Sequence, residues 1–89
     1  MEQKSIEIGG AQFEVDAAKL GSWRVFNMLK KVRTSEDDFG RVDLLMEIAC
    51  YITGLELDAF IEKCGGDEAS AEHVISLASK LIMAAYPKN

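Results

Sequence analysis

The sequence predicts a small α+β domain, mostly α, in which an N-terminal β-hairpin is followed by about four helices. Apolar and polar residues alternate on both sides of Gly9-Gly10, which is typical of a hairpin. From Trp23 onward, apolar residues recur at helical spacing. The chain has 89 residues, of which 48% are hydrophobic and 28% charged. This size and composition predict a single domain over residues 1–89.

The hairpin is expected over about 4–15. Ile6 and Ile8 before the glycine pair lie on the same face as Phe13 and Val15 after it, and the two glycines supply the positive φ angles of a tight turn. The sequence leaves open where the loop ends, and therefore also the register of the strands. An isolated hairpin is marginal in water, so its apolar face is expected to pack against the helices.

The helical part is expected over about 17–86. Asp16 and Ser22 are candidate N-caps, and Gly21 argues against one continuous helix between them. The main predicted helices span about Trp23–Arg33, Phe39–Thr53, Asp58–Cys64 and Ser70–Tyr86.

Several residues are predicted to mark the ends of these helices. Ser35 and Asp38 resemble a capping box, Gly54 is a candidate C-cap, and Pro87 follows the last helix. The helix over 39–53 carries two adjoining apolar stripes and is expected to be central. The last helix is expected to bury one stripe, made of Val74, Leu77, Ala78, Leu81, Ile82 and Ala85.

Charge is unevenly distributed along the chain. The net charge is −5, which argues against nucleic acid as the main partner. Residues 17–33 contain five basic residues and no acidic one, whereas residues 34–72 contain eleven acidic and two basic residues. This bipolar pattern fits self-association of copies, although pairing within one chain or simple solvation explains it equally well.

Catalytic, metal and membrane functions find little support in the sequence. The thiols of Cys50 and Cys64 lie in helical apolar patterns and are expected to be buried and free. The single histidine, His73, has no evident catalytic partner, and the acidic run at 36–38 fits a solvated helix start. We therefore expect a non-enzyme without cofactor or metal. No apolar run reaches the ~20 residues of a membrane span, and the N-terminus lacks signal-peptide features, so a cytoplasmic location is the default.

A candidate partner-binding face consists of Lys19, Trp23, Phe26 and Lys30. On a helical projection these residues fall off the apolar stripe of the first long helix. The commoner arrangement would have Trp23 packing on the hairpin and closing the core. The alternative is an exposed aromatic and cationic contact face, since Trp and Arg dominate interface hot spots.

An acyl carrier is a further candidate for a small acidic helical protein. It would need a serine at a helix start in an Asp-Ser-Leu-like context. Ser22 lies in LGSWRV and the leading hairpin does not suit that fold, so this candidate is set aside.

The opening IEIGGAQFEVDAAKLGSWRVFNML resembles the tail assembly chaperones of long-tailed bacteriophages, especially those of Gram-positive hosts or their prophages. In that family a short hairpin leads into an L-x-S-W-R-V segment, here Leu20–Val25, and then into a compact helical domain. The likeness spans nearly the whole chain and contains no catalytic motif.

The resemblance implies a non-enzymatic role in the cytoplasm of the bacterial host. The protein would bind the tape-measure protein, keep it soluble and help recruit tail-tube subunits. It also implies a longer form made by ribosomal frameshifting, and the ending Pro-Lys-Asn is compatible with a slippery A-AAA-AAC codon run. The alternative is a small acidic adaptor or regulator, unrelated to phage tails, that binds protein through the same face.

Overall fold

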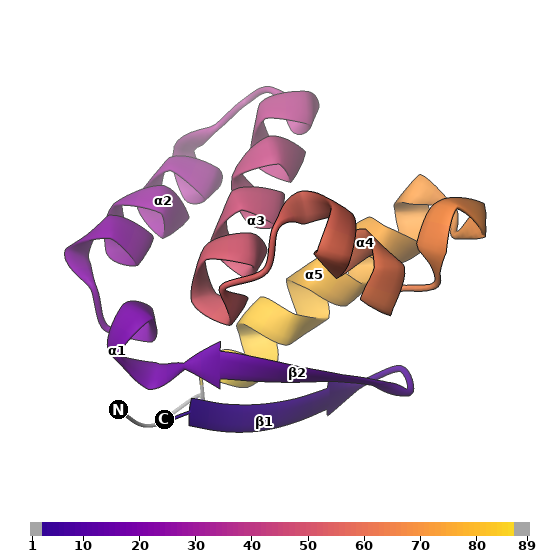
Figure 1. Cartoon of the computed structure of the whole chain (residues 1–89). Coiled ribbons are helices and arrows are strands. Elements are labelled where there is room, and N and C mark those ends of the chain that lie inside the picture. Colours follow the sequence, from indigo (N-terminus) through magenta and orange to yellow (C-terminus); the bar gives the residue numbers. More distant parts are fainter. Residues whose placement is uncertain (1–2, 87–89) are drawn as a thin grey trace.

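The computed structural model describes residues 3–86, apart from the side chain of Asp67, and has the predicted α+β architecture (Figure 1). The strands and helices in chain order are β1 (Gln3–Ile8), β2 (Ala11–Asp16), α1 (Ala17–Leu20), α2 (Trp23–Thr34), α3 (Asp38–Thr53), α4 (Leu57–Lys63), the 3-10 turn η1 (Gly66–Glu68) and α5 (Ala71–Ala85). The hairpin is therefore confirmed, as are the four main helices. The short helix α1 precedes them.

The hairpin closes through a two-residue turn at Gly9 and Gly10, whose φ angles are +56° and +85°. Two positive φ angles in a two-residue loop match the right-handed twist of the strands. Ile6 pairs with Phe13 and Ile8 with Ala11. Because Ala11 is already a strand residue, this pairing fixes the register that the sequence left open.

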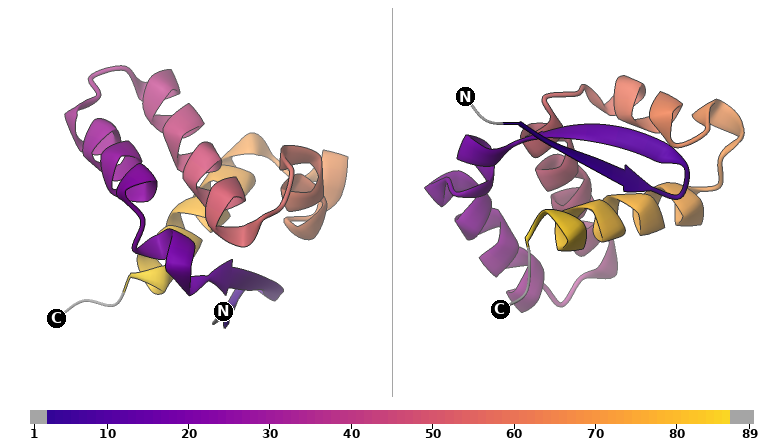
Figure 2. Two further views of the ribbon diagram at one scale, coloured as in Figure 1. Left: turned by 60° about the vertical axis from the view of Figure 1, so that its left-hand side comes forward. Right: turned by 90° about the horizontal axis from the view of Figure 1, so that it is seen from below.

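One face of the hairpin lies on the helices. β2 packs on α3 and β1 on α5, and the views from the side and from below agree on this layering (Figures 1 and 2). Phe13 and Val15 are fully buried, whereas Ile6 and Ile8 are half-buried. The second strand therefore contributes most of the buried surface that holds the hairpin in place.

The turn approaches α5 closely, which gives a first testable prediction. A Cβ added at Gly9 would lie 3.0 Å from Cδ2 of Leu77, whereas one added at Gly10 would meet nothing within 4 Å. Alanine at either position must adopt a positive φ, at a cost of about 1–2 kcal/mol. We expect Gly9→Ala to lower the thermal unfolding midpoint more than Gly10→Ala. Equal midpoints would contradict the close packing of the turn on α5.

Helices α1 and α2 are separate because each has its own N-cap. Asp16 Oδ1 accepts a hydrogen bond from the Ala18 amide (2.9 Å), and Ser22 Oγ accepts one from the Val25 amide (3.3 Å). Gly21 ends α1. The interruption between the two caps allows α2 to leave the hairpin and run beside α3 (Figure 1).

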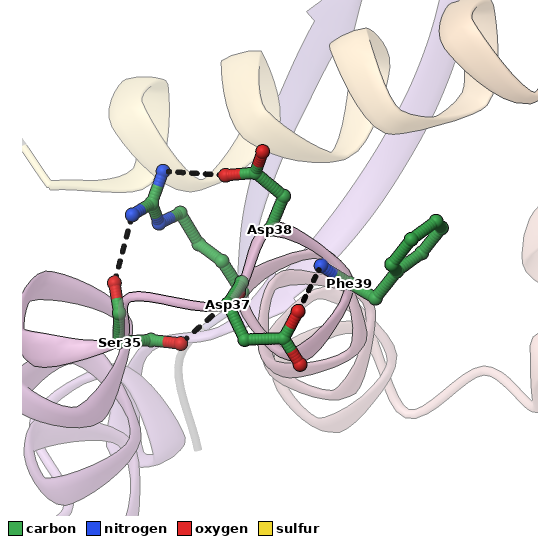
Figure 3. Close-up of polar contacts among 5 residues, drawn as sticks. Ser35, Asp37, Asp38 and Phe39 are labelled. Carbon is green, nitrogen blue, oxygen red and sulfur yellow. Dashed lines mark hydrogen bonds and ion pairs between the residues drawn. The ribbon is translucent and has the colours of Figure 1, made fainter.

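The predicted capping box at the start of α3 is wrong. The N-cap is Asp37, whose Oδ1 accepts a hydrogen bond from the Phe39 amide (3.2 Å; Figure 3). Ser35 instead donates its hydroxyl to the Asp37 carbonyl (3.1 Å) and accepts from Arg41 through its own carbonyl (2.8 Å). Arg41 also pairs with Asp38 at 3.6 Å. Both serine and aspartate can cap a helix, and the sequence alone did not show which one the backbone places at the helix start.

Helix α3 is central, as predicted, and contacts α1, α2, α4, α5 and β2. It ends at Gly54, whose φ of +73° confirms the predicted C-cap. The core residues are apolar and come from β2 and from the segments of α2 to α5. Those fully buried with the largest side chains are Phe13, Phe60, Ile48, Ile52, Leu81, Val15 and Val25.

Helix α5 buries all six residues of its predicted inward stripe. Ser70 caps its start by accepting a hydrogen bond from the His73 amide (3.0 Å). At its end, the Tyr86 hydroxyl donates to the carbonyl of Leu20 (2.7 Å), which ties the end of α5 to α1. Pro87, predicted to follow this helix, lies outside the described residues.

The burial of three acidic groups predicts a loss of stability at alkaline pH. Burial raises the pKa of Tyr86 above its ordinary 10.0, and raises the pKa values of Cys50 and Cys64 above 9.0. Above these ordinary values the unfolded chain loses protons that the folded chain retains, so the free energy of unfolding falls as pH rises. We expect urea midpoints to be steady near pH 8 and to fall above about pH 9. Tyr86→Phe should flatten the part of the decline above about pH 10, and an unchanged profile would contradict this assignment.

Candidate protein-binding face

The outer face of α2 carries two exposed aromatic rings. Trp23 is 71% exposed and Phe26 is 51% exposed, and their ring centroids lie 5.1 Å apart in a stacked arrangement with an interplanar angle of 27°. Val25, on the opposite side of the helix, is fully buried. Large aromatic side chains are usually buried in a monomer, so an exposed stacked pair is a candidate interaction site.

The expectation that Trp23 closes the core is therefore wrong, and the alternative of an exposed ring is correct. The hairpin packs on α3 and α5, whereas α2 packs chiefly on α3. After the break at Gly21, helix α2 extends away from the strands (Figure 2), and Trp23, its first residue, is largely exposed.

Lys30 lies on the same helix as the two rings, whereas Lys19 lies on the separate helix α1. Lys30 is exposed one helical turn after Phe26. Lys19 lies in α1, and its ammonium is 5.0 Å from the ring centroid of Tyr51. The helical projection placed Lys19 on the same helix as Trp23, Phe26 and Lys30. In the structure the chain breaks at Gly21, so the position of Lys19 around α1 does not predict its position relative to α2. We call Trp23, Phe26 and Lys30 the aromatic face.

Two basic side chains, Lys19 and Arg24, contact the ring of Tyr51, and the sequence did not predict this arrangement. The guanidinium of Arg24 lies 4.9 Å from the ring centroid of Tyr51, and the ammonium of Lys19 lies 5.0 Å from it. Such cation–π contacts are worth about 0.5–1 kcal/mol at exposed sites. They hold α1 and α2 against α3, so Lys19 has a structural partner within the chain.

The basic charge of α2 is not neutralised by ion pairs among the residues that the structure describes. Within them, the pair between Arg41 and Asp38 is the one salt bridge, and it lies at the start of α3. Lys30, Lys31 and Arg33 are all exposed. The positive stripe is therefore presented to solvent next to the aromatic pair.

Two shallow grooves lie on the other side of α3, and sequence reasoning missed both. The first, which we call the acidic groove, has a volume of about 490 Å³ and is lined by Asp43, Met46, Glu47, Cys50, Leu55, Glu56 and Leu57. The second is uncharged, has a volume of about 400 Å³ and is lined by Val42, Met46, Ile61, Gly66, Ala69, Ala71, Val74 and Ile75. Their residues come from α3, α4, α5 and the segments that connect these helices, and no single helical pattern reveals such a combination.

Other exposed apolar side chains lie outside the aromatic face. Phe39 is 83% exposed at the start of α3, Met83 is 61% exposed on α5, and Leu57 is 50% exposed at the rim of the acidic groove. Phe39 and Leu57 were not singled out from the sequence, because each lies within an otherwise ordinary apolar pattern.

The cysteine, histidine and acidic side chains are the groups that catalysis or metal binding would use. Over residues 3–86 without the Asp67 side chain, no group of three or more His, Cys, Asp or Glu side chains is placed to hold a metal ion. Cys64 is buried and Cys50 half-buried, both are free, and burial raises the pKa of each thiol, which disfavours the reactive thiolate. His73 is exposed on the first turn of α5. None of the helices in the described part of the chain is both long and apolar enough to cross a bilayer.

No family model matches the chain, and no curated protein or solved structure matches it either.

Proposed function

We propose that this chain is a non-enzymatic protein-binding domain that acts as a tail assembly chaperone of a long-tailed phage. In this role it binds the tape-measure protein in the cytoplasm of the bacterial host, keeps it soluble and helps recruit tail-tube subunits. The observation that supports protein binding is the exposed stacked pair of Trp23 and Phe26 beside Lys30. The assignment to phage tails rests on the resemblance of residues 6–29 to that family.

The aromatic face suits an amphipathic helical client. Two adjacent rings offer an apolar surface that costs little conformational entropy on binding, and Lys30 at its edge can pair with an acidic side chain of the client. One such patch is small, so firm retention of a long client requires many copies along it. The chemistry is reversible binding, which permits displacement when tube subunits polymerise.

Co-expression with the tape-measure protein encoded beside this chain tests the proposal. We expect the client to become soluble and to co-purify with the chain. A neighbouring tube gene and a very long tape-measure gene are the genomic setting that this function requires. If those genes are missing, or if the client stays insoluble and unbound, the proposal fails and an adaptor or regulator that uses the same face takes its place.

A further inference from the structure

We propose that the free edge of β1 accepts an extended segment of a partner protein as a third strand, and that this segment alternates apolar and basic residues. The site is separate from the aromatic face on α2, so the inference goes beyond the proposed function and does not depend on it. Three features of the hairpin carry it: an open edge on β1, apolar side chains that are only half-buried beside that edge, and an acidic outer face.

The strand pairing leaves the backbone groups of every second residue of β1 without a partner in the hairpin. Ile8 and Ala11 flank the two-residue turn and pair with each other across it. In an antiparallel ladder, pairs that exchange hydrogen bonds alternate with pairs that do not. The N–H and C=O groups of Gln3, Ser5 and Glu7 therefore point away from β2, in the plane of the sheet.

The two outer edges of the hairpin differ in what covers them. On β2, the carbonyl oxygen of Gln12 accepts a hydrogen bond from the ammonium of Lys63 on α4 (2.9 Å). Among the residues that the structure describes, no hydrogen bond from outside the hairpin reaches the backbone of β1. Seen from below, α4 lies on the β2 side of the hairpin and α5 on the β1 side (Figure 2). Because α5 packs on the face of the hairpin, it leaves the β1 edge open and offers a surface beneath an added strand.

The core-facing side of β1 is incompletely covered. Ile6 and Ile8 face the helices but are only half-buried, whereas Phe13 and Val15 on β2 are fully buried. A two-stranded sheet is marginal on its own, and a third strand would add apolar cover beside these two isoleucines. Side chains of the added strand alternate between the two faces, so every second residue of the segment should be apolar.

The outer face of the hairpin selects the charge of the remaining residues. Glu7 and Glu14 are exposed on this face, and the other exposed strand residues there, Gln3, Ser5 and Gln12, are uncharged. Opposite charges on neighbouring strands stabilise a sheet, and like charges destabilise it. A basic segment therefore fits this face. Edge-to-edge pairing of two copies would instead gather the glutamates of both copies on one face.

Amide exchange with solvent, measured by NMR on the full chain, tests this inference. The probe is a capped synthetic peptide of alternating valine and lysine, as long as β1. We expect exchange at the Ser5 and Glu7 amides to slow about tenfold when the peptide is at about ten times its dissociation constant. The outward amides of Gln12 and Glu14 on β2 should change little. No slowing on β1 at peptide concentrations up to about 1 mM would overturn the inference. Slowing that depends on protein concentration without peptide would also overturn it, since that would show pairing between copies.

Backbone methylation of the probe separates strand addition from simple charge attraction. Only one of the two alternating sets of peptide N–H groups can face β1. These are the lysine amides if the added strand is antiparallel to β1, and the valine amides if it is parallel. N-methylation of one set should therefore abolish binding, and N-methylation of the other should leave it unchanged. Equal effects of the two methylated peptides would refute strand addition, and this test leaves the protein itself unaltered.

Two charge variants test the choice of a basic segment. Glu7→Lys/Glu14→Lys should lose affinity for the valine–lysine peptide and gain affinity for a valine–glutamate peptide. The control Glu36→Lys/Glu47→Lys changes the net charge equally outside the hairpin and should keep the preference for lysine. All four positions are exposed, so circular dichroism should show a retained fold. A hairpin variant that still prefers the lysine peptide, or a control that loses this preference, would overturn the assignment of a basic partner.

Discussion

Phe60→Ala is expected to remove a large share of the free energy of unfolding of this protein. Phe60 lies on α4 with no exposed surface, and its ring centroid is 5.2 Å from that of Phe13 on β2. Truncating a buried phenylalanine to alanine costs about 3–5 kcal/mol. Domains of this size have a total free energy of unfolding on the order of 5–10 kcal/mol, so the substitution removes a large share of it.

The loss should be large because this ring pair joins α4 to the hairpin. Lys63 covers the pair, with its ammonium 2.9 Å from the carbonyl oxygen of Gln12 and 5.8 Å from the ring centroid of Phe13. When the Phe60 ring is removed, β2 and α4 lose the ring contact between Phe13 and Phe60. The effect should therefore spread beyond the site of substitution.

Urea unfolding followed by far-UV circular dichroism measures this effect. Phe39→Ala is the matched control, because it removes the same atoms from a side chain that is 83% exposed. The control should change the free energy of unfolding by no more than about 0.5 kcal/mol. Similar losses for the two variants would show that the core is not organised around Phe60.

Local rules of sequence predicted most of this fold. Gly9 and Gly10 indicated the hairpin because two positive φ angles in a row are difficult for other residues. The inward stripe of α5 was fully correct, because a helix with one buried face repeats its apolar residues at a fixed period. Gly54 was a correct C-cap because glycine readily adopts a positive φ, and Ser70 marked the start of α5 because its hydroxyl can accept a hydrogen bond from the first turn.

The candidate site was harder to predict because it depends on the direction of α2 relative to the rest of the chain. A helical projection correctly placed Trp23 and Phe26 off the buried stripe. It could not show whether the hairpin would reach them, because strand packing on α3 and α5 is a long-range property. Nor could it show that Lys19 lies on a separate short helix, because α1 ends at Gly21 and α2 begins after its own N-cap, Ser22.

The two grooves were also not predicted, because they depend on how separate helices pack together. The acidic groove combines residues of α3 with the residues that lead into α4, and its acidic side chains read in sequence as ordinary solvated positions. Their significance appears only when they surround an apolar floor. The bipolar charge pattern did indicate that two surfaces of opposite sign exist, but it gave no information on where they lie.

Trp23→Ala/Phe26→Ala is expected to abolish capture of the client while leaving the fold intact. The two rings are largely in solvent, so their removal should change the free energy of unfolding by about 0.5 kcal/mol or less. A binding hot spot contributes about 2 kcal/mol or more, so the loss of one should weaken client binding by about 30-fold and the loss of both should weaken it further.

Co-purification with the tape-measure protein and thermal unfolding of the free chain measure the two effects separately. Phe39→Ala is again the control, since it removes an equally exposed ring from α3 and should leave capture unchanged. If the double variant still captures its client, the aromatic face is not the binding site. If Phe39→Ala loses capture as well, the client contacts both α2 and the start of α3, because no stability change would account for the loss.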